Sequence, residues 1–435
     1  MQVTVDAGEG LERRLTVQVP EEQISPEVQK RLNSMRKTAR IAGFRPGKVP
    51  MKVLERRYGK DVRGEVISGL IQSSFMEAVA KEDLSPAGAP TIDAVNDVAG
   101  GGFSYTAVFE VYPQVAIPDV SGFEITRPVA EVTDDDVEQM IQTLREQRRT
   151  WEDVERPAAD GDQVVIDFTG TIEGEAFPGN SASDFPLELG SGRLMDGFEA
   201  GLVGAAPGDT RTLELGFPED YHAKDFAGKP VTFEVTVKKV QEARLPELDE
   251  TFFRGFGVNS GTREDFFSEV RSNMERELAE ALGSQVKTRV MDALLEASAV
   301  EAPQALVEQE AERLRNQARG SLGAASGSVQ ELDLSLFTGQ ARRRVSLGLL
   351  LAEVVKQKGL EADQGRVRRR VEDIAASYED SDQVVAWYFQ DRQRLQEIES
   401  MVMEEQIVDW VLENARVEDE HTTFDAIMKR GQTST

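Results

Sequence analysis

The stretch QVVIDFTGTI (Gln163–Ile172) begins a run of short β-rich segments in the middle of the chain. Further segments of this kind follow it, and glycines and prolines separate them, as turns separate the strands of a small β domain. These segments are FPLELG (185–190), TRTLELGF (210–217) and VTFEVTVKKV (231–240). The sequence therefore predicts a β domain inserted between Gly161 and Val240.

On the N-terminal side of this insert, residues 1–112 predict an α+β domain. Ser25 and Pro26 predict a helix start, with the serine as cap and the proline in the first turn. A second helix is predicted from about Met51 and a third over 65–83. Two other stretches alternate with period two and predict strands. Their apolar residues are Val3, Val5, Leu15, Val17 and Val19, and then Phe103, Tyr105, Ala107, Phe109 and Val111.

On the C-terminal side the chain is predicted to be helical almost to its end. A capping-box pattern at Thr133 and Asp136 first predicts a connecting helix within 131–150. From Phe267 to Leu294, apolar residues recur every three or four positions, which predicts one long helix. A helix of that length needs partners along it, so we expect helical hairpins that project as arms. Further helices are predicted over 303–320, 338–358, 363–378, 381–390 and 392–415.

The composition limits the function. At 435 residues the chain should form about two to four domains. Its net charge of −28 should repel nucleic acid and anionic membranes over most of the surface. The absence of cysteine excludes disulfides, thiolate metal sites and cysteine nucleophiles, and only two histidines are present. Because there is no signal-peptide pattern and no run of eighteen apolar residues, we expect a cytoplasmic protein with no membrane partner.

One short loop contrasts with this acidic surface. Between Lys30 and Arg63 there are twelve cations and two carboxylates, and GFRPGKVP (43–50) lies in the middle of that region, between two predicted helices. Its glycines and prolines favour a stiff, exposed tip. Phe44, flanked by Arg45 and Lys48, is then an aromatic anchor on a contact surface. A merely solvated basic loop is the alternative.

The same loop resembles the ribosome-binding signature of the bacterial trigger factor family, Gly-Phe-Arg-x-Gly-Lys-x-Pro, at every fixed position. The resemblance implies that the loop docks at the polypeptide exit tunnel, on a ribosomal protein and neighbouring ribosomal RNA. Cations that neutralise RNA phosphates would make the contact reversible and sensitive to salt. The implied contact residues are Gly43, Phe44, Arg45, Gly47, Lys48 and Pro50.

The inserted β domain resembles FKBP-type peptidyl-prolyl isomerases through IDFTGTIEGEAF, LELGSGRLMDGFEAGLVGAAPGD, FPEDYH and GKPVTFEVTVKKV, which come in the family's order. Many such domains have Trp at the pocket floor, whereas this chain has Gly197-Phe198-Glu199, as trigger factors tend to have. The alternative is that these aromatic residues form only the core of a half-barrel. The implied proline pocket comprises Phe168, Phe177, Phe185, Leu194, Met195, Phe198, Tyr221 and Phe233.

Prolyl isomerisation needs no nucleophile, which suits this composition. The barrier of about 18–20 kcal/mol arises from C–N double-bond character, which water strengthens and an apolar pocket weakens. Catalysis then consists of desolvating the bond and favouring the twisted amide. We assign no general acid or base, no metal and no cofactor, since phosphate-binding glycine motifs are also missing from the sequence.

The helical part shows no catalytic constellation, but it has apolar and flexible side chains that can adapt to many unfolded sequences. The resemblance implies that an inner face of the arms holds nascent polypeptide. For any single residue, packing of one helix on the next is the simpler interpretation. The candidates are Leu332, Leu334, Leu336 and Phe337, then Val384–Phe389, then Met401, Val402 and Met403.

Taken together, the order of these parts resembles the trigger factor family over the whole chain. It implies a multidomain α+β protein that is an ATP-independent, ribosome-associated chaperone with isomerase activity and forms a homodimer when free. The alternatives are a free FKBP-type foldase of the cytosol and a holdase that binds proline without turning it over. The expected parts are an N-terminal ribosome-binding domain (1–112), a connector (113–150), an FKBP-like antiparallel half-barrel (151–246) and an all-α substrate-cradling domain (247–435).

Overall fold

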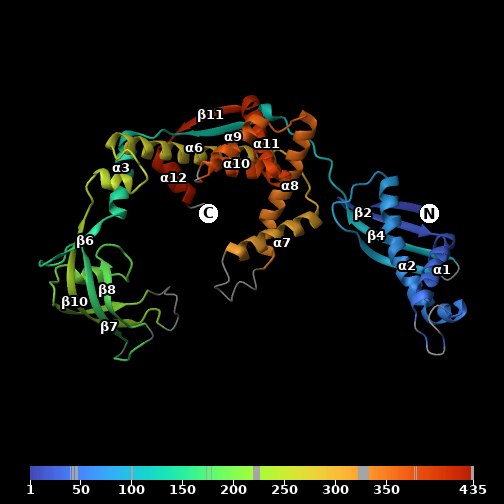
Figure 1. Ribbon diagram of the computed structural model, residues 1–435, viewed down its shortest axis with the longest axis horizontal. Helices are drawn as coiled ribbons and strands as arrows, with labels where there is room; N and C mark the ends of the chain where they lie inside the picture. Colours follow the sequence, from blue (N-terminus) through green and yellow to red (C-terminus); the bar gives the residue numbers. More distant parts are fainter. Residues whose placement is uncertain are drawn as a thin grey trace. The chain divides into compact units, whose positions relative to one another are not determined.

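The structure is a computed structural model of the whole chain (Figure 1). Two compact units are distinguished, one formed by Met1–Arg127 with Gln285–Glu420, the other by Pro128–Ser284 with His421–Thr435. The residues that the structure describes are 1–39, 41, 44, 48–98, 101–172, 174–177, 179–218, 226–321, 333–376, 378 and 380–432.

The N-terminal part of the first unit is a four-stranded antiparallel sheet with two helices beside it (Figure 1). The alternating residues predicted as strands lie in β1, β2 and β4, except Val111, which follows β4 and bridges to Pro86. Their inward side chains, such as Leu15 and Phe109, form the core with Phe75 and Ala78 of α2. The strand order is β1-β2-β4-β3, so β3 is an edge strand. The elements are β1 (Gln2–Ala7), β2 (Glu12–Val19), α1 (Glu21–Thr38), α2 (Met51–Lys81), β3 (Thr91–Val98) and β4 (Gly102–Glu110).

Two helix boundaries differ from the prediction. Helix α1 begins at Glu21, not at Ser25, and Pro26 lies inside it. The hydroxyl of Ser25 does not cap the helix but donates to the Glu21 carboxylate at 2.7 Å. The predicted second and third helices are one helix, α2, because its interior glycines keep helical geometry and packing on the sheet offsets their low propensity.

The predicted β insert is confirmed as a five-stranded antiparallel sheet in the second unit, ordered β6-β10-β7-β8 with β9 also paired to β10. Its concave core combines Val164, Ile166, Val235 and Val237 with residues of the short helix α4. The elements are β6 (Thr150–Val154), β7 (Gln163–Thr171), β8 (Ser181–Glu188), α4 (Phe198–Leu202), β9 (Thr210–Gly216) and β10 (Pro230–Arg244).

The remaining elements are mainly helices, as predicted. The capping box is confirmed, because the Thr133 hydroxyl accepts from the Asp136 N–H and the Asp136 carboxylate accepts from the Thr133 N–H. The elements are η1 (Val120–Gly122), β5 (Glu124–Val129), α3 (Asp134–Gln147), α5 (Glu250–Arg254), α6 (Arg263–Glu296), α7 (Gln304–Ser321), α8 (Ser335–Lys358), α9 (Gln364–Ala375), α10 (Ser381–Gln390), α11 (Arg392–Asn414), β11 (Arg416–His421) and α12 (Phe424–Gln432).

The last strand and helix were not predicted. Strand β11 pairs with β5, and Arg127 of β5 binds Asp419 of β11 through two hydrogen bonds of 2.7 and 3.0 Å. His421 is exposed at the end of β11. Within the ranges given above, no helix is long and apolar enough to cross a membrane.

Candidate functional site

An aromatic cluster fills the concave side of the β insert. The ring of Phe168 in β7 lies 5.8 Å from the ring of Phe185 and 6.0 Å from the rings of both Phe198 and Phe233, measured between centroids. All three contacts are edge-to-face, the arrangement that ring quadrupoles favour. Strands β7, β8 and β10 and helix α4 therefore bring four of the predicted residues together.

A second aromatic group adjoins the first. Phe177 lies 6.0 Å from Phe217 and 5.3 Å from Phe226. Sequence reasoning did not include Phe217 and Phe226 in the pocket. Their signal was an aromatic residue on each side of the segment that holds Tyr221, which itself lies outside the described residues.

Burial separates the cluster into a base and a wall. Phe198 and Phe233 are 2% and 7% exposed and form the base. The side chains of the wall are half-buried and pack against this base, so they offer apolar surface at its edge. They are Phe168, Phe177, Phe185, Leu194 and Met195.

Charges near the cluster are paired on the sheet. Lys238 of β10 binds the carboxylates of Asp167 at 2.9 Å and Asp184 at 2.8 Å. Hydrogen bonds from Lys238 and from the Asp184 N–H hold the pKa of Asp167 below its usual value. Asp167 therefore stays ionised near neutral pH and is not suited to be a general acid there.

The basic loop is anchored on both sides of its tip. Ile41 and Val49 are buried with Leu54 and other residues of α1 and α2. Phe44, between these anchors, is 40% exposed, and Lys48 and Pro50 are also exposed. Gly43, Arg45 and Gly47, which the sequence also predicts to be contact residues, lie outside the described residues.

The predicted apolar arm residues are exposed in part. Helix α10 contains no buried residue, and Trp387 on it is 49% exposed with the Arg394 guanidinium 3.6 Å from its ring centroid. Leu336 and Met401 are exposed, whereas Val402 is fully buried in a helical core. Leu332 lies outside the described residues.

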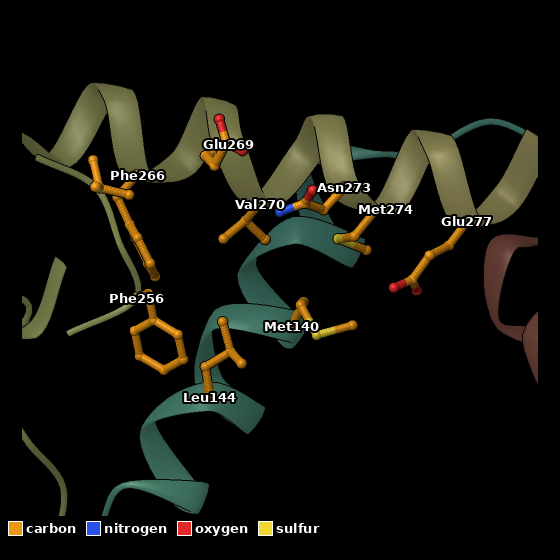
Figure 2. Close-up of a pocket in the computed structure, with 10 residues that line it drawn as sticks. Met140, Leu144, Phe256, Phe266, Glu269, Val270, Asn273, Met274 and Glu277 are labelled. Atoms are coloured by element: carbon orange, nitrogen blue, oxygen red, sulfur yellow. The ribbon is translucent and has the colours of Figure 1, made fainter. Parts of the chain in front are cut away.

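An apolar cavity of about 200 Å³ lies between α3 and α6 in the second unit, and sequence reasoning missed it. Figure 2 shows Met140, Leu144 and Phe256 on one side and Val270 and Met274 on the other. Polar side chains at its edge include Glu269, Asn273 and Glu277. In the part of the chain that the structure describes, no cluster of His, Asp and Glu could hold a metal ion.

Comparison with known proteins gives three family matches. The model of "Bacterial trigger factor protein (TF)" matches residues 1–144, and that of its C-terminus matches residues 262–413. The model of "FKBP-type peptidyl-prolyl cis-trans isomerase" matches residues 154–238, which contain all eight predicted pocket residues.

Full-length relatives are similar as well. The chain is 49% identical over 431 residues to a protein named "Trigger factor" from Azotobacter vinelandii, covering 99% of this chain and 98% of that one. It is 46% identical over 434 residues to a "Trigger factor" of Pseudomonas putida, covering 99% of both chains. A solved structure, "Promiscuous Substrate Recognition in Folding and Assembly Activities of the Trigger Factor Chaperone", overlaps 95% of this chain with a TM-score of 0.48 and 18% identity.

Proposed function

This chain belongs to the trigger factor family, and from that premise we propose which of its residues perform each part of the family's work. It is a ribosome-associated chaperone with an FKBP-type peptidyl-prolyl cis-trans isomerase domain. Its binding partners are the ribosome and nascent polypeptide. We propose that residues 1–112 bind the ribosome, 113–150 connect, 151–246 catalyse isomerisation and 247–435 cradle the client.

The proposed isomerase pocket is the aromatic cluster of the β insert. A prolyl ring placed against the half-buried Phe168, Phe177 and Phe185 would leave water, and the C–N bond beside it would lose the solvation that favours its planar form. The pocket needs to contribute only differential binding of the twisted amide. The observation that carries this proposal is the packing of half-buried apolar side chains around a fully packed aromatic base.

The proposed ribosome contact is the segment between Ile41 and Val49, in which Phe44 and Lys48 are exposed. Phe44 would insert against a ribosomal protein at the exit tunnel, while Lys48 and Arg45 would pair with phosphates of ribosomal RNA. Support comes from the burial of both anchors beside Phe44, because packed anchors hold a ring that is 40% exposed, and aromatic rings are common anchors of protein interfaces.

Co-sedimentation with ribosomes at low and high salt tests this contact. We expect Phe44→Ala to weaken binding at both salt concentrations, and Lys48→Ala to weaken it mainly at low salt. Lys81→Ala, an exposed cation at the far end of α2, is the matched control and should bind like the parent. If all four proteins sediment alike, the loop is only solvated, and a free foldase of the cytosol becomes the better account.

We also propose that the protein acts in the cytoplasm, where ribosomes are, and that it forms a homodimer when free. The dimer rests on family membership alone and is tested by sedimentation equilibrium over a range of concentrations.

For clients, the proposed surfaces are the exposed side chains of α10 and the cavity between α3 and α6, which combine apolar area with access from solvent.

A further inference from the structure

The carboxylate of Glu199 is surrounded by hydrogen-bond donors from one loop. Glu199 follows the base residue Phe198 in α4, and the loop leads from β8 to that helix. The donors to its Oε2 are the N–H groups of Gly190 at 2.9 Å and Gly192 at 3.0 Å, and those to its Oε1 are the Ser191 hydroxyl at 3.1 Å and the N–H groups of Arg193 at 3.0 Å and Leu194 at 3.3 Å.

This carboxylate is buried without an opposite charge. Glu199 is 8% exposed, and no lysine or arginine of the described ranges forms an ion pair with it. Burial alone would raise the pKa of Glu199. The hydrogen bonds from the loop together lower it by more, so the pKa of Glu199 lies below its usual value. The neutral donors of the loop therefore stabilise the charge, and the charge in turn fixes the loop.

The loop also carries the wall of the proposed pocket. Gly190 and Gly192 have φ angles of +89° and +65°, which bend the backbone around the carboxylate. Leu194, the last donor, and the next residue Met195 both pack against the aromatic base. Glu199 is thus bonded to the backbone of one wall residue and is adjacent in sequence to the base residue Phe198.

We propose that Glu199 is a positioning residue for prolyl isomerisation, which holds Leu194 and Met195 at the distance from Phe198 that a prolyl ring requires. This inference rests on the pocket proposed above. Glu199 does not touch the substrate, so it acts through the loop. A loosened wall should weaken substrate binding more than it slows the bound amide's rotation.

Glutamine at this position tests the charge with little change of shape. One of its terminal groups is an NH₂, which cannot accept from the N–H groups that now face it. In full-length Glu199→Gln we expect KM for a short proline peptide to rise about tenfold, with kcat within about threefold of the parent. Glu199→Asp keeps the charge on a shorter stem and should recover part of the loss.

Asp162→Asn is the matched control. Asp162 is 4% exposed in the same β insert and accepts from Arg156 at 2.5 and 3.0 Å and from the Ala159 N–H at 2.8 Å, but not from the 190–194 loop. Its replacement should lower the melting temperature and leave KM unchanged. If Glu199→Gln behaves in the same way, with lower stability and an unchanged KM, Glu199 is only structural and the inference is wrong.

A milder variant keeps the test valid if Glu199→Gln fails to fold. Ser191→Ala removes one side-chain donor and should raise KM two- to threefold at an unchanged melting temperature; an unchanged KM overturns the inference. An inactive parent protein would instead refute the isomerase pocket, and the positioning role with it. Parent activity together with an unchanged KM in these variants refutes the positioning role alone.

Discussion

The ring of Phe198 in α4 lies 5.3 Å from the ring of Phe233 in β10, at an interplanar angle of 76°. These two buried rings join the helix to the sheet, so the base of the proposed pocket is at the same time the core of the half-barrel. The two interpretations of these aromatic residues, pocket or core, are therefore compatible at the base. Only the half-buried residues of the wall can separate them experimentally.

Phe185→Ala and Phe198→Ala should both lower isomerase activity, but they should differ in how much stability they cost. Removing the buried Phe198 should cost about 3–5 kcal/mol of unfolding free energy, as large-to-small core changes do. Phe185 is half-buried, so its loss should cost less stability and still lower kcat/KM for a proline peptide. Urea unfolding and a peptide isomerisation assay measure both quantities; full activity in stable Phe185→Ala would argue against the pocket.

A buried hydroxyl pair supports the N-terminal sheet. Tyr105 of β4 lies 2.9 Å from the Ser74 hydroxyl and donates to the Ile71 carbonyl at 3.2 Å. Tyr105→Phe should lower the unfolding free energy by about 0.5–1.5 kcal/mol, because it removes these hydrogen bonds while the Ser74 hydroxyl keeps its bond to the Leu70 carbonyl at 2.5 Å. Combining it with Ser74→Ala should cost less than the sum of the two single changes, and additive costs in that double-mutant cycle would contradict the pairing.

Acid should weaken the attachment of α1 to α2. Arg63 binds Glu21 through two hydrogen bonds of 2.9 Å, and these bonds lower the pKa of Glu21 to about 2. Since the folded pKa is below the unfolded one, the stabilisation is complete above about pH 4.5 and is lost as the pH falls toward 2. Its size should be about 1–2 kcal/mol once solvent screening is discounted.

The difference in unfolding free energy between the parent and Glu21→Gln measures this contribution. We expect it to be constant from pH 7 to 5 and to shrink as the pH is lowered further. Ser25→Ala removes a weaker partner of the same carboxylate and serves as a graded comparison. A difference that is as large at pH 3 as at pH 7 would exclude Glu21 as the titrating group.

Trp387→Ala tests the client surface on α10. Because α10 contains no buried residue, the change should leave the melting temperature nearly unaltered while weakening suppression of aggregation of an unfolded client. Gln390→Ala, at an exposed position of the same helix, should suppress aggregation like the parent. If the parent and both variants suppress aggregation equally, the client does not bind through Trp387 of α10.

Local patterns predicted much of the fold because the residues that decide an element lie within it. The helix expected over 381–390 is Ser381–Gln390, and the capping box at Thr133 marks the start of α3 as expected. The start of α1 was missed because a partner 42 residues away, Arg63, holds the first turn at Glu21. Strand β11 was missed for a similar reason, since its charged sequence RVEDEH is stabilised by pairing with β5.

The site was predictable to the extent that a motif fixed it. The motif's residues on β7, β8, β10 and α4 do converge, yet their division into base and wall depends on burial. Phe217 begins the FPEDYH motif but was not assigned to the pocket, and Phe226 lies outside the quoted motifs, although the two rings lie 6.0 Å apart. The support of the loop by Glu199 depends on hydrogen bonds that the sequence does not show. The cavity between α3 and α6 joins segments far apart in sequence, and the apolar repeat that contains Val270 and Met274 predicts their helix but not the helix that they face.

The pairing of β5 with β11 has a consequence for the protein's own synthesis. Asp419, which binds Arg127, is added to the chain 292 residues later. At about 5–20 residues per second, the β5 edge waits roughly 15–60 s for its partner strand to be translated. During that interval this chaperone is itself an unfinished nascent chain with an unpaired strand edge. Until its last strand emerges, that edge needs protection from pairing with other chains.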